Sequence, residues 1–415
     1  MVGTMATLAK AELGLVDRRI FVDPDIYQQE LEQIFGRCWL YLGHESQVAN
    51  PNDFLATYMG EDPVLLTRDG KGRLHGFLNM CRHRGNRICR ADFGNAPSFM
   101  CTYHGWTFAT DGKLVGVPGY KEAYFEELDR SQWGFVETAQ IESYKGLVFA
   151  TWDRQAPPLL KYLGKMTSEL DFLVGRHDSP TEILGVNKWA LSSNWKYPAD
   201  NFGGDDGHHA ITHGSVRQLD DNRAYSSSFG GRSALAARNE PRDPLENFRR
   251  GPIREYYRAH VDEAKRKLGL SENDTRGYAG SVGTVFPNTS IHCVRHSIRT
   301  WHPRGPTRTE IWSYCITDKE APIDVKNAMK AYLTGSFSPG GVLEQDDMNN
   351  WLQSTSTALS PTGQKYVQAI LAGLGHDKEK YTIGTKLRQI YARWANMMDA
   401  PSWNEVNLDW RYGRE

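Results

Sequence analysis

The sequence predicts an α+β protein of two domains, in which a compact antiparallel β domain precedes a larger domain of mixed helices and strands. The chain has 415 residues, which is more than one hydrophobic core ordinarily serves. Short apolar runs broken by turn signals fill the stretch from Trp39 to Trp152, as in a domain of hairpins. After Pro157-Pro158, helix-like and strand-like runs follow in an order typical of an α+β domain.

The composition is that of a globular protein and excludes several functional classes. Hydrophobic residues make up 40% of the chain and charged residues 24%, which is ordinary for a globular domain. A formal net charge of −1 provides no basic surface for nucleic acid or acidic lipid. No apolar run could span a bilayer, and Met1 to Lys10 lacks the apolar core of a signal peptide. We expect a cytoplasmic protein that binds neither nucleic acid nor membrane.

The first expected element is a helix over about 24–36. Asp23 suits the N-cap and Pro24 the first helical position, and apolar residues then recur at helical spacing. We expect residues 1–37 to form a helical segment that packs on the second domain, which spans 157–415. Residues 38–156 form the β domain, where the Asp-Gly pairs at 69–70 and 111–112 indicate hairpin turns.

The second domain contains both periodicities. Its strand-like runs are Ile183–Val186, Gly283–Phe286 and Thr309–Ile316. Its helix-like runs are Arg254–Leu268, Ile323–Leu333 and Thr362–Leu374. The polar stretch from Arg217 to Arg254 is either a solvated surface loop or a flexible lid, and its composition favours the loop.

Two pairs of Cys and His stand out in the β domain. Cys81-Arg82-His83 and Cys101-Thr102-Tyr103-His104 each combine a thiol with an imidazole at a turn. Two thiolates and two imidazoles can hold either a [2Fe–2S] cluster of relatively high potential or a zinc ion, and ligand type alone leaves both open. A disulfide framework is not expected in a cytosolic chain of this size. The other cysteines are interpreted as ordinary buried thiols: Cys38, Cys89, Cys293 and Cys315.

A second constellation lies between Asp200 and His213, where three His and several Asp occur in one short stretch. Two His and one carboxylate form a facial triad that leaves iron positions open for O2. His209 and His213 are four residues apart and share a helix face, whereas His208 and His213 are five apart and require an irregular helix. Periodicity therefore favours His209.

These motifs resemble those of one enzyme family. Cys-x-His and Cys-x2-His, followed by Arg84-Gly85 and Gly105-Trp106, resemble the Rieske motif of ring-hydroxylating oxygenases. The sequence is similar to the large α subunits of Rieske non-haem iron aromatic-ring dioxygenases, and Arg299–Pro306 resembles the biphenyl- and naphthalene-type enzymes. The resemblance also rests on these later motifs: Asn194-Trp195-Lys196, Asp200-Asn201 and Asp205-x2-His208-x4-His213.

The resemblance implies a ligand set. Cys81, His83, Cys101 and His104 would hold the [2Fe–2S] cluster. His208, rather than His209, would bind the mononuclear Fe(II) together with His213. The late stretch Glu344-Gln345-Asp346-Asp347 resembles the family's Glu-x-Asp-Asp, which makes Asp347 the third ligand. Asp205 would link a cluster His to an iron-bound His of the neighbouring subunit. The sequence departs from the family at Gly207, where Tyr is usual, and at Asp200, where Glu is usual.

The resemblance also implies an activity. A terminal oxygenase of this kind has a helix-grip (START-like) catalytic domain and uses O2 and NADH-derived electrons to convert an aromatic hydrocarbon or carboxylate to a cis-dihydrodiol. No G-x-G-x-x-G motif or P-loop is present, so a separate reductase or ferredoxin would handle the nicotinamide. The family implies an α3 trimer, or an α3β3 hexamer with a small β subunit. The alternatives are a Rieske monooxygenase or demethylase, a cluster-only electron-transfer protein, and a zinc-stabilised binding module.

The expected substrate pocket follows from the same resemblance. Asn201, Phe202, Phe337 and Leu343 would line it, and the aromatic and aliphatic members suit an arene. His292 and Arg295 occupy pocket-facing positions that are usually apolar in the family. Arg295 either pairs with a carboxylate on the substrate or points away to an internal acid, because a shift of one residue in strand register reverses its side.

Overall fold

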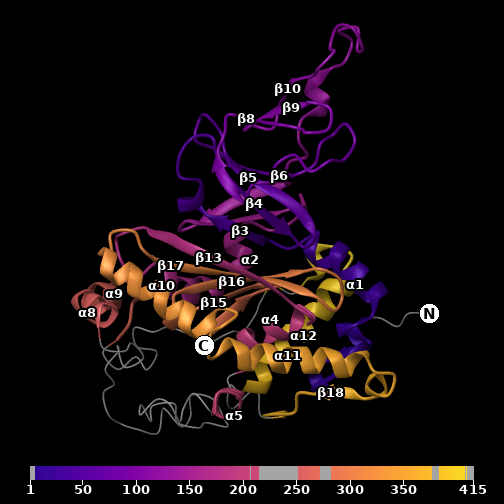
Figure 1. Cartoon of the computed structure of the whole chain (residues 1–415). Helices are drawn as coiled ribbons and strands as arrows, with labels where there is room; N and C mark the ends of the chain where they lie inside the picture. The colour runs from indigo at the N-terminus through magenta and orange to yellow at the C-terminus, as the bar shows by residue number, and fades with distance from the viewer. Residues whose placement is uncertain are drawn as a thin grey trace. The chain divides into compact units, whose positions relative to one another are not determined.

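The computed structural model describes residues 5–205, 207–214, 251–271, 282–375, 383–406 and 408 (Figure 1). Contacts divide the chain into two compact units, Phe35–Leu159 and Met1–Ile34 with Leu160–Glu415. The predicted boundaries after residues 37 and 156 lie close to this division. Residues 217–250 of the loop predicted from Arg217 to Arg254 lie outside the described residues, and its last residues, from Pro252 on, form the start of a helix instead. No helix among the described residues is long and apolar enough to cross a membrane.

The Phe35–Leu159 unit consists of antiparallel strands in three sheets, with orders β6-β5-β4-β7, β10-β9-β8 and β11-β12-β3. The predicted turns at 69–70 and 111–112 join β5 to β6 and β9 to β10. Aromatic side chains fill the core around Phe77, Phe108 and Phe135. The strands are β3 (Leu40–His44), β4 (Asp53–Met59), β5 (Asp62–Arg68), β6 (Leu74–Leu78), β7 (Phe93–Asn95), β8 (Ser98–Met100), β9 (Thr107–Ala109), β10 (Leu114–Gly116), β11 (Gln140–Tyr144) and β12 (Leu147–Thr151).

The other unit is built on a five-stranded antiparallel sheet of order β13-β17-β16-β15-β14 (Figure 1). Strands β16 and β17 are almost entirely buried, although β16 contains polar residues such as Arg299, Thr300 and His302. The small sheet β1-β2-β18 belongs to the same unit. The strands are β1 (Ala9–Lys10), β2 (Leu15–Asp17), β13 (Thr181–Leu191), β14 (Val282–Val285), β15 (Thr289–His292), β16 (Ser297–Pro303), β17 (Thr309–Asp318) and β18 (Val367–Ala369).

Helices pack on this sheet and on one another. Helix α4 contacts β14 and β15, and α11 and α12 both contact α4 (Figure 1). The arrangement confirms the α+β class and places the N-terminus of α11 near the end of α4. The helices are α1 (Pro24–Glu30), α2 (Leu159–Leu163), α3 (Met166–Val174), α4 (Lys196–Gly204), α5 (His209–Thr212), α8 (Pro252–Ala259), α9 (Val261–Leu268), α10 (Ile323–Phe337), α11 (Glu344–Leu359) and α12 (Ile383–Asp399).

The expected N-terminal helix forms with the expected cap. The Asp23 carboxylate accepts hydrogen bonds from the backbone N–H groups of Asp25 and Ile26, and Pro24 begins α1. After Glu30 the helix continues as a π turn over Leu31–Phe35. The helix predicted over about 24–36 is therefore present, with a change of winding in its second half.

Two helix predictions are changed by the structure. The run from 254 to 268 forms two helices, α8 and α9, which meet at His260. The helix predicted at 362–374 is wrong, because residues Val367–Ala369 form β18 and pair with Leu15–Asp17 of β2. The open edge of β2 offers backbone hydrogen bonds, and such tertiary pairing outweighs a weak helical pattern.

Candidate metal centres

The Cys and His pairs of the Phe35–Leu159 unit lie on two loops with the same backbone pattern. In the first loop, the Cys81 N–H donates to the carbonyl of Asn86 and the Gly85 N–H to the carbonyl of Cys81. In the second, Cys101 N–H donates to the carbonyl of Trp106, and Gly105 N–H to that of Cys101. Each turn needs a glycine at its positive φ, 76° at Gly85 and 72° at Gly105. The two loops thus present their thiols and imidazoles in equivalent ways.

The surroundings of these four side chains suit a [2Fe–2S] cluster. Both thiols are buried. The Cys101 sulfur accepts hydrogen bonds from the N–H groups of Tyr103 and His104 and lies 3.6 Å from Asn86 Nδ2, and such bonds stabilise thiolate and tune a cluster's potential. The rings of His83 and His104 are 4.6 Å apart. His83 Nδ1 is buried and has no hydrogen-bond partner among the described residues, so it is available to a metal.

Burial also affects the protonation of His83. Desolvation lowers the pKa of His83, and the positive charges of His104 and Arg84 lower it further. The neutral imidazole is the form that binds a metal. The ring of His83 stacks on Trp106 with centroids 5.1 Å apart, which fixes its orientation. The remaining cysteines are buried as well, and none of the six forms a disulfide.

In the other unit, His208, His213 and Asp347 converge. One ligand atom from each lies within 4.8 Å of the others. Asp347 Oδ1 is 3.4 Å from Nε2 of both His208 and His213. Metal–ligand bonds of about 2.0–2.2 Å place neighbouring ligand atoms about 3 Å apart, so a single ion fits between these atoms.

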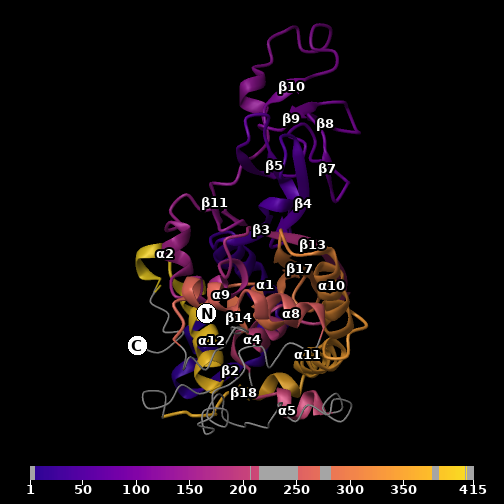
Figure 2. The ribbon, with the colours of Figure 1, turned by 90° about the vertical axis from the view of Figure 1, so that its left-hand side faces the viewer.

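The backbone explains why two His five residues apart can meet. Helix α5 is a single turn over His209–Thr212, with His208 as its N-cap and His213 as its C-cap. The two imidazoles therefore flank a short helix rather than share the face of a long one. The side chain of His209 lies outside the described part of the chain. Asp347 comes from the first turn of α11, which lies beside α5 in both views (Figure 1, Figure 2). Asn350 Nδ2 of α11 donates a hydrogen bond of 3.2 Å to Thr212 Oγ1 of α5.

An acceptor group lies behind each of the two imidazoles. His213 Nδ1 lies 3.3 Å from Asp346 Oδ2. His208 Nδ1 donates to the backbone carbonyl of Asp205, whose carboxylate Oδ2 is 3.9 Å away. Such partners fix the tautomer, and the Nε2 atom of each imidazole then points toward Asp347, where a metal would bind. Sequence reasoning missed the contact between Asp346 and His213, although the adjacent acids at 346 and 347 were a usable signal.

The charge balance at Asp347 also fits a cation. Burial raises the pKa of Asp347 well above its usual range, and the nearby charges of Glu344, Asp346 and Asp205 add to this, while Arg299 opposes it. Asp347 Oδ1 has no hydrogen-bond partner among the described residues. A buried carboxylate without a donor is costly, and a divalent ion would supply the missing positive charge.

A cavity with about 310 Å³ of empty volume opens onto the three converging residues. Of the predicted pocket residues, Asn201, Phe202, His292 and Phe337 line it, as does Asp205. The rings of Phe202 and Phe337 are 6.2 Å apart and His292 packs 5.3 Å from Phe337. Val282 at the start of β14 also lines it and was missed, because a lone Val carries no sequence signal.

Two predicted pocket residues lie outside that lining. Leu343 is buried and precedes the first turn of α11. Arg295 ends a 3-10 turn over Cys293–Arg295, and its guanidinium lies 4.2 Å from the ring centre of Tyr332 and 5.9 Å from that of Phe337. Its positive charge still acts on the site. Burial lowers the pKa of His213, and the charge of Arg295 lowers it further.

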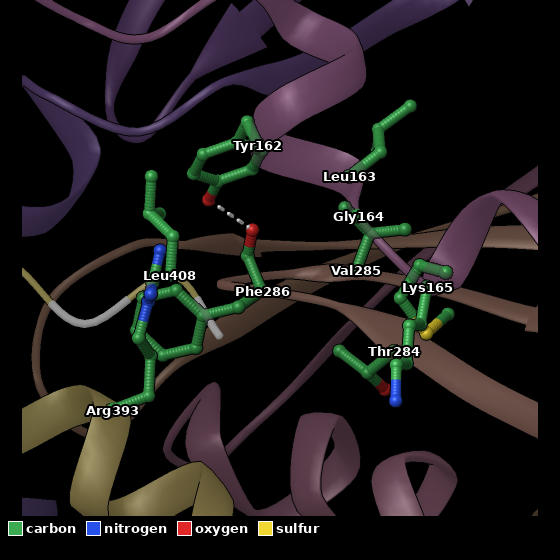
Figure 3. Close-up of a pocket in the computed structure, with 10 residues that line it drawn as sticks. Tyr162, Leu163, Gly164, Lys165, Thr284, Val285, Phe286, Arg393 and Leu408 are labelled. Atoms are coloured by element: carbon green, nitrogen blue, oxygen red, sulfur yellow. Dashed lines mark hydrogen bonds between the residues drawn. The ribbon is translucent and has the colours of Figure 1, made fainter. Parts of the chain in front are cut away.

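A second cavity of the same unit contains none of the predicted site residues (Figure 3). Tyr162 OH donates to the carbonyl of Phe286 at 2.6 Å across it. Arg393 and Leu408 close one side, and Lys165 and Thr284 the other. The described residues that line it include no acid, thiol or imidazole.

Comparison with known proteins agrees with this geometry. Residues 38–144 match the Rieske [2Fe-2S] domain family, and residues 170–399 match the catalytic domain of the ring-hydroxylating alpha subunit. Biphenyl 2,3-dioxygenase subunit alpha of Rhodococcus jostii is 37% identical, over 96% of this chain and 92% of its own length. Benzene 1,2-dioxygenase subunit alpha of Pseudomonas putida is 36% identical, over 96% and 94%.

Solved structures give the same result. Naphthalene 1,2-dioxygenase from Rhodococcus sp. bound to indole has a TM-score of 0.80 at 29% identity, covering 96% of this chain and 98% of its own. A naphthalene 1,2-dioxygenase variant bound to phenanthrene has a TM-score of 0.83 at 28% identity, covering 96% and 95%. The resemblance seen in the motifs is confirmed. The chain belongs to the family of ring-hydroxylating oxygenase α subunits, with a Rieske [2Fe–2S] domain followed by a catalytic domain that binds mononuclear iron.

Proposed function

We propose that His208, His213 and Asp347 hold the catalytic iron and that the protein dihydroxylates a neutral aromatic ring to a cis-dihydrodiol. The observation that carries this proposal is the convergence of these three side chains at one end of a cavity walled by Phe202 and Phe337. The relatives described above are named as dioxygenases of biphenyl, benzene and naphthalene, which favours dihydroxylation over monooxygenation or demethylation.

The proposed reaction joins an arene, O2, two protons and two electrons into one cis-dihydrodiol. When bound, the cluster supplies an electron and the mononuclear iron provides the site at which O2 is activated. The residues of this chain bind and orient. The faces of Phe202 and Phe337 hold the planar ring by dispersion and exclude water. Asp346 binds Nδ1 of His213, and the carbonyl of Asp205 accepts a hydrogen bond from Nδ1 of His208. The Nε2 atom of each imidazole therefore faces the metal.

The position of Arg295 favours a neutral arene over an aromatic carboxylate. A carboxylate anchor should line the cavity, but the Arg295 guanidinium stacks on Tyr332. The cavity also contains the carboxylates of Asp205 and Asp347, which would repel an anionic substrate. His292 remains as a polar group of the lining, able to contact a substituent on the ring.

We also propose the family's assembly for this chain: three α subunits, with or without a small β subunit, and electrons from NADH through a reductase or ferredoxin. Asp205 would then link His208 to a cluster His of the neighbouring subunit. The exposure of His104 and of Tyr103, which is 56% exposed in the single chain, supports a contact of the cluster edge with another protein.

The ligand assignment is tested with a matched pair of variants, His208→Ala and His209→Ala. Both remove one imidazole from the same short segment, and His208 is the one proposed to bind iron because, among the described side chains, it converges with Asp347. We expect His208→Ala to lose the mononuclear iron and all product while keeping the red-brown cluster, and His209→Ala to keep its iron. Iron and acid-labile sulfide are assayed on each purified protein. The reverse pattern would show that the regular helix spacing, not the family register, selects the ligand.

The substrate class is tested by comparing biphenyl and benzoate as probes with wild type and Arg295→Leu. We expect product from biphenyl with both proteins, because the guanidinium packs outside the cavity lining. Product from benzoate alone, lost in Arg295→Leu, would overturn the neutral-arene assignment and make Arg295 a carboxylate anchor.

A further inference from the structure

A buried ion pair lies directly behind the cavity. Arg299 of β16 and Glu344 at the start of α11 are both 0% exposed, and Arg299 Nη1 donates to Glu344 Oε2 at 2.6 Å. Glu344 stands one helical turn before Asp347 on α11. The pair therefore joins the central sheet to the turn that carries the proposed third iron ligand.

The same guanidinium also touches both aromatic walls of the cavity. Its carbon lies 4.6 Å from the ring centre of Phe202 and 4.4 Å from that of Phe337. Phe202 comes from α4 and Phe337 from the last turn of α10, so one side chain contacts two walls from different helices. A planar guanidinium can stack on two rings at once, which an ammonium group does far less well.

This arrangement costs stability. Arg299 Nε and Nη2 and Glu344 Oε1 are buried and have no hydrogen-bond partner among the described residues. A buried pair that leaves donors and an acceptor unsatisfied is commonly no more stable than hydrophobic residues of the same volume. An arrangement that is poor for stability, placed between a substrate wall and a metal ligand, indicates a role in positioning.

We infer that Arg299 is a positioning residue that fixes the angle of the two cavity walls through Phe202 and Phe337 and, through Glu344, the place of Asp347. It contacts neither substrate nor metal in this account. The inference rests on the proposed function, since it assigns the cavity to the arene and Asp347 to the iron. It extends that function by naming what couples the orientation of the ring to the geometry of the metal site.

Four variants separate positioning from simple stabilisation. Arg299→Lys keeps the charge but loses the planar stacking. Glu344→Gln replaces the charge-assisted bond between Arg299 and α11 by a weaker neutral one and leaves the guanidinium on both rings. The double variant R299M/E344L removes both charges and fills the space with apolar atoms, so it tests the idea even if single variants fold poorly. The control is Arg388→Met, which removes a buried guanidinium that bonds the carbonyls of Ile370 and Ala372 away from this cavity.

Each purified protein is examined for its melting temperature, the rate at which a chelator removes the mononuclear iron, and the products from biphenyl. The products are scored as the ratio of positional isomers and as diol formed per O2 consumed. A ring misplaced by about 1 Å can lose up to about 100-fold in rate, so we expect Arg299→Lys to lower diol per O2 about tenfold and to change the isomer ratio. We expect Glu344→Gln to release iron about tenfold faster.

The double variant gives the sharpest result. We expect it to melt at or above the wild-type temperature while its isomer ratio and diol per O2 stay altered. The double variant could instead melt normally and match wild type in isomer ratio, diol per O2 and rate of iron release. Arg299 would then only fill space, and the inference would be wrong. Arg388→Met should lower the melting temperature without moving the other readouts; a matching change in isomer ratio there would equally overturn the inference.

Failure of the proposed function is distinguishable from failure of this inference. If wild-type protein with both metals makes no diol from biphenyl, the proposed substrate class is wrong. The chelator measurement needs no turnover, so the tether between Glu344 and Asp347 is then still tested. Unchanged iron release in Glu344→Gln would contradict that tether.

Discussion

In the Phe35–Leu159 unit, all four predicted cluster ligands come from two loops with the same hydrogen-bond pattern. In the other unit, the proposed iron ligands come from both ends of the single-turn helix α5 and from the first turn of α11. The first site is formed by short-range turns that glycine permits. The second exists only after α4, α5 and α11 have packed on one another.

The difference has a chemical counterpart. The cluster loops hold their thiols with backbone N–H groups, so the protein contributes a fixed, local cage. The iron site relies on the Asp346 carboxylate behind His213, on the backbone carbonyl of Asp205 behind His208, and on a cavity beside the two imidazoles. A site that must admit O2 and substrate leaves positions open, whereas a site that only passes electrons need not. Substitutions should therefore act locally at the first site and through several elements at the second.

The largest effect is expected at the cluster. Cys101→Ser removes a predicted thiolate ligand, so we expect the red-brown colour, the acid-labile sulfide and all turnover to be lost while the iron proposed at His208 and His213 is retained. Absorption spectra and metal analysis measure this. Cys89→Ser is the control, because that thiol is buried 3.5 Å from the carbonyl of Ala91 and outside both loops. Loss of colour in Cys89→Ser would mean that the loops do not form a self-contained site.

The next effect separates two neighbouring acids in the catalytic unit. Asp347→Ala should remove the mononuclear iron and abolish product. Asp346→Ala deletes only the partner of His213 Nδ1 and should lower iron affinity or activity about 10- to 100-fold. Iron titration followed by turnover compares the two. Equal and complete loss in both variants would make Asp346 a ligand rather than a support.

The smallest expected effect concerns pH and the Phe35–Leu159 unit. Burial lowers the pKa of His44, which is 3% exposed at the end of β3, to about 4. Because the folded pKa is lower than the ordinary one of about 6.5, its stabilising effect is complete above pH 6.5. It falls as pH drops toward 4, by up to about 3 kcal/mol. Thermal melts between pH 7.5 and 5 measure this.

A substitution isolates the contribution of that imidazole. His44 Nδ1 accepts from the Ser46 N–H at 3.1 Å as a helix cap, and Asn can provide the same acceptor without titrating. We expect His44→Asn to flatten the decline of melting temperature between pH 6.5 and 5. The same slope in both proteins would show that other groups cause the decline.

The sequence predicted best those features that depend on neighbours in the chain. The cap at Asp23, the hairpins at 69–70 and 111–112, and the Cys and His loops all follow from local chemistry. The helix at 362–374 was mispredicted because β18 pairs with β2, a contact that no local pattern records. The helical pattern of residues 254–268 likewise gave no sign of the break at His260 between α8 and α9.

The candidate site divides in the same way. Spacing alone favoured His209, and only the family register pointed to His208, because the single turn of α5 is set by packing rather than by periodicity. Phe202, His292 and Phe337 were expected in the lining and lie there. Val282, the support from Asp346 and the pair of Arg299 with Glu344 could not be predicted, since each depends on which distant segments meet.

We propose that one chain carries both an electron-delivering cluster and an iron site that dihydroxylates an arene. The most direct test is a single turnover: the purified protein is reduced without O2, freed of reductant, and mixed with biphenyl and 18O2. We predict a diol that carries two labelled oxygens, formed without any reductase and in proportion to the reduced cluster. A protein with full iron and sulfide content that reoxidises without forming labelled diol, from biphenyl, benzene or naphthalene, would contradict the claim.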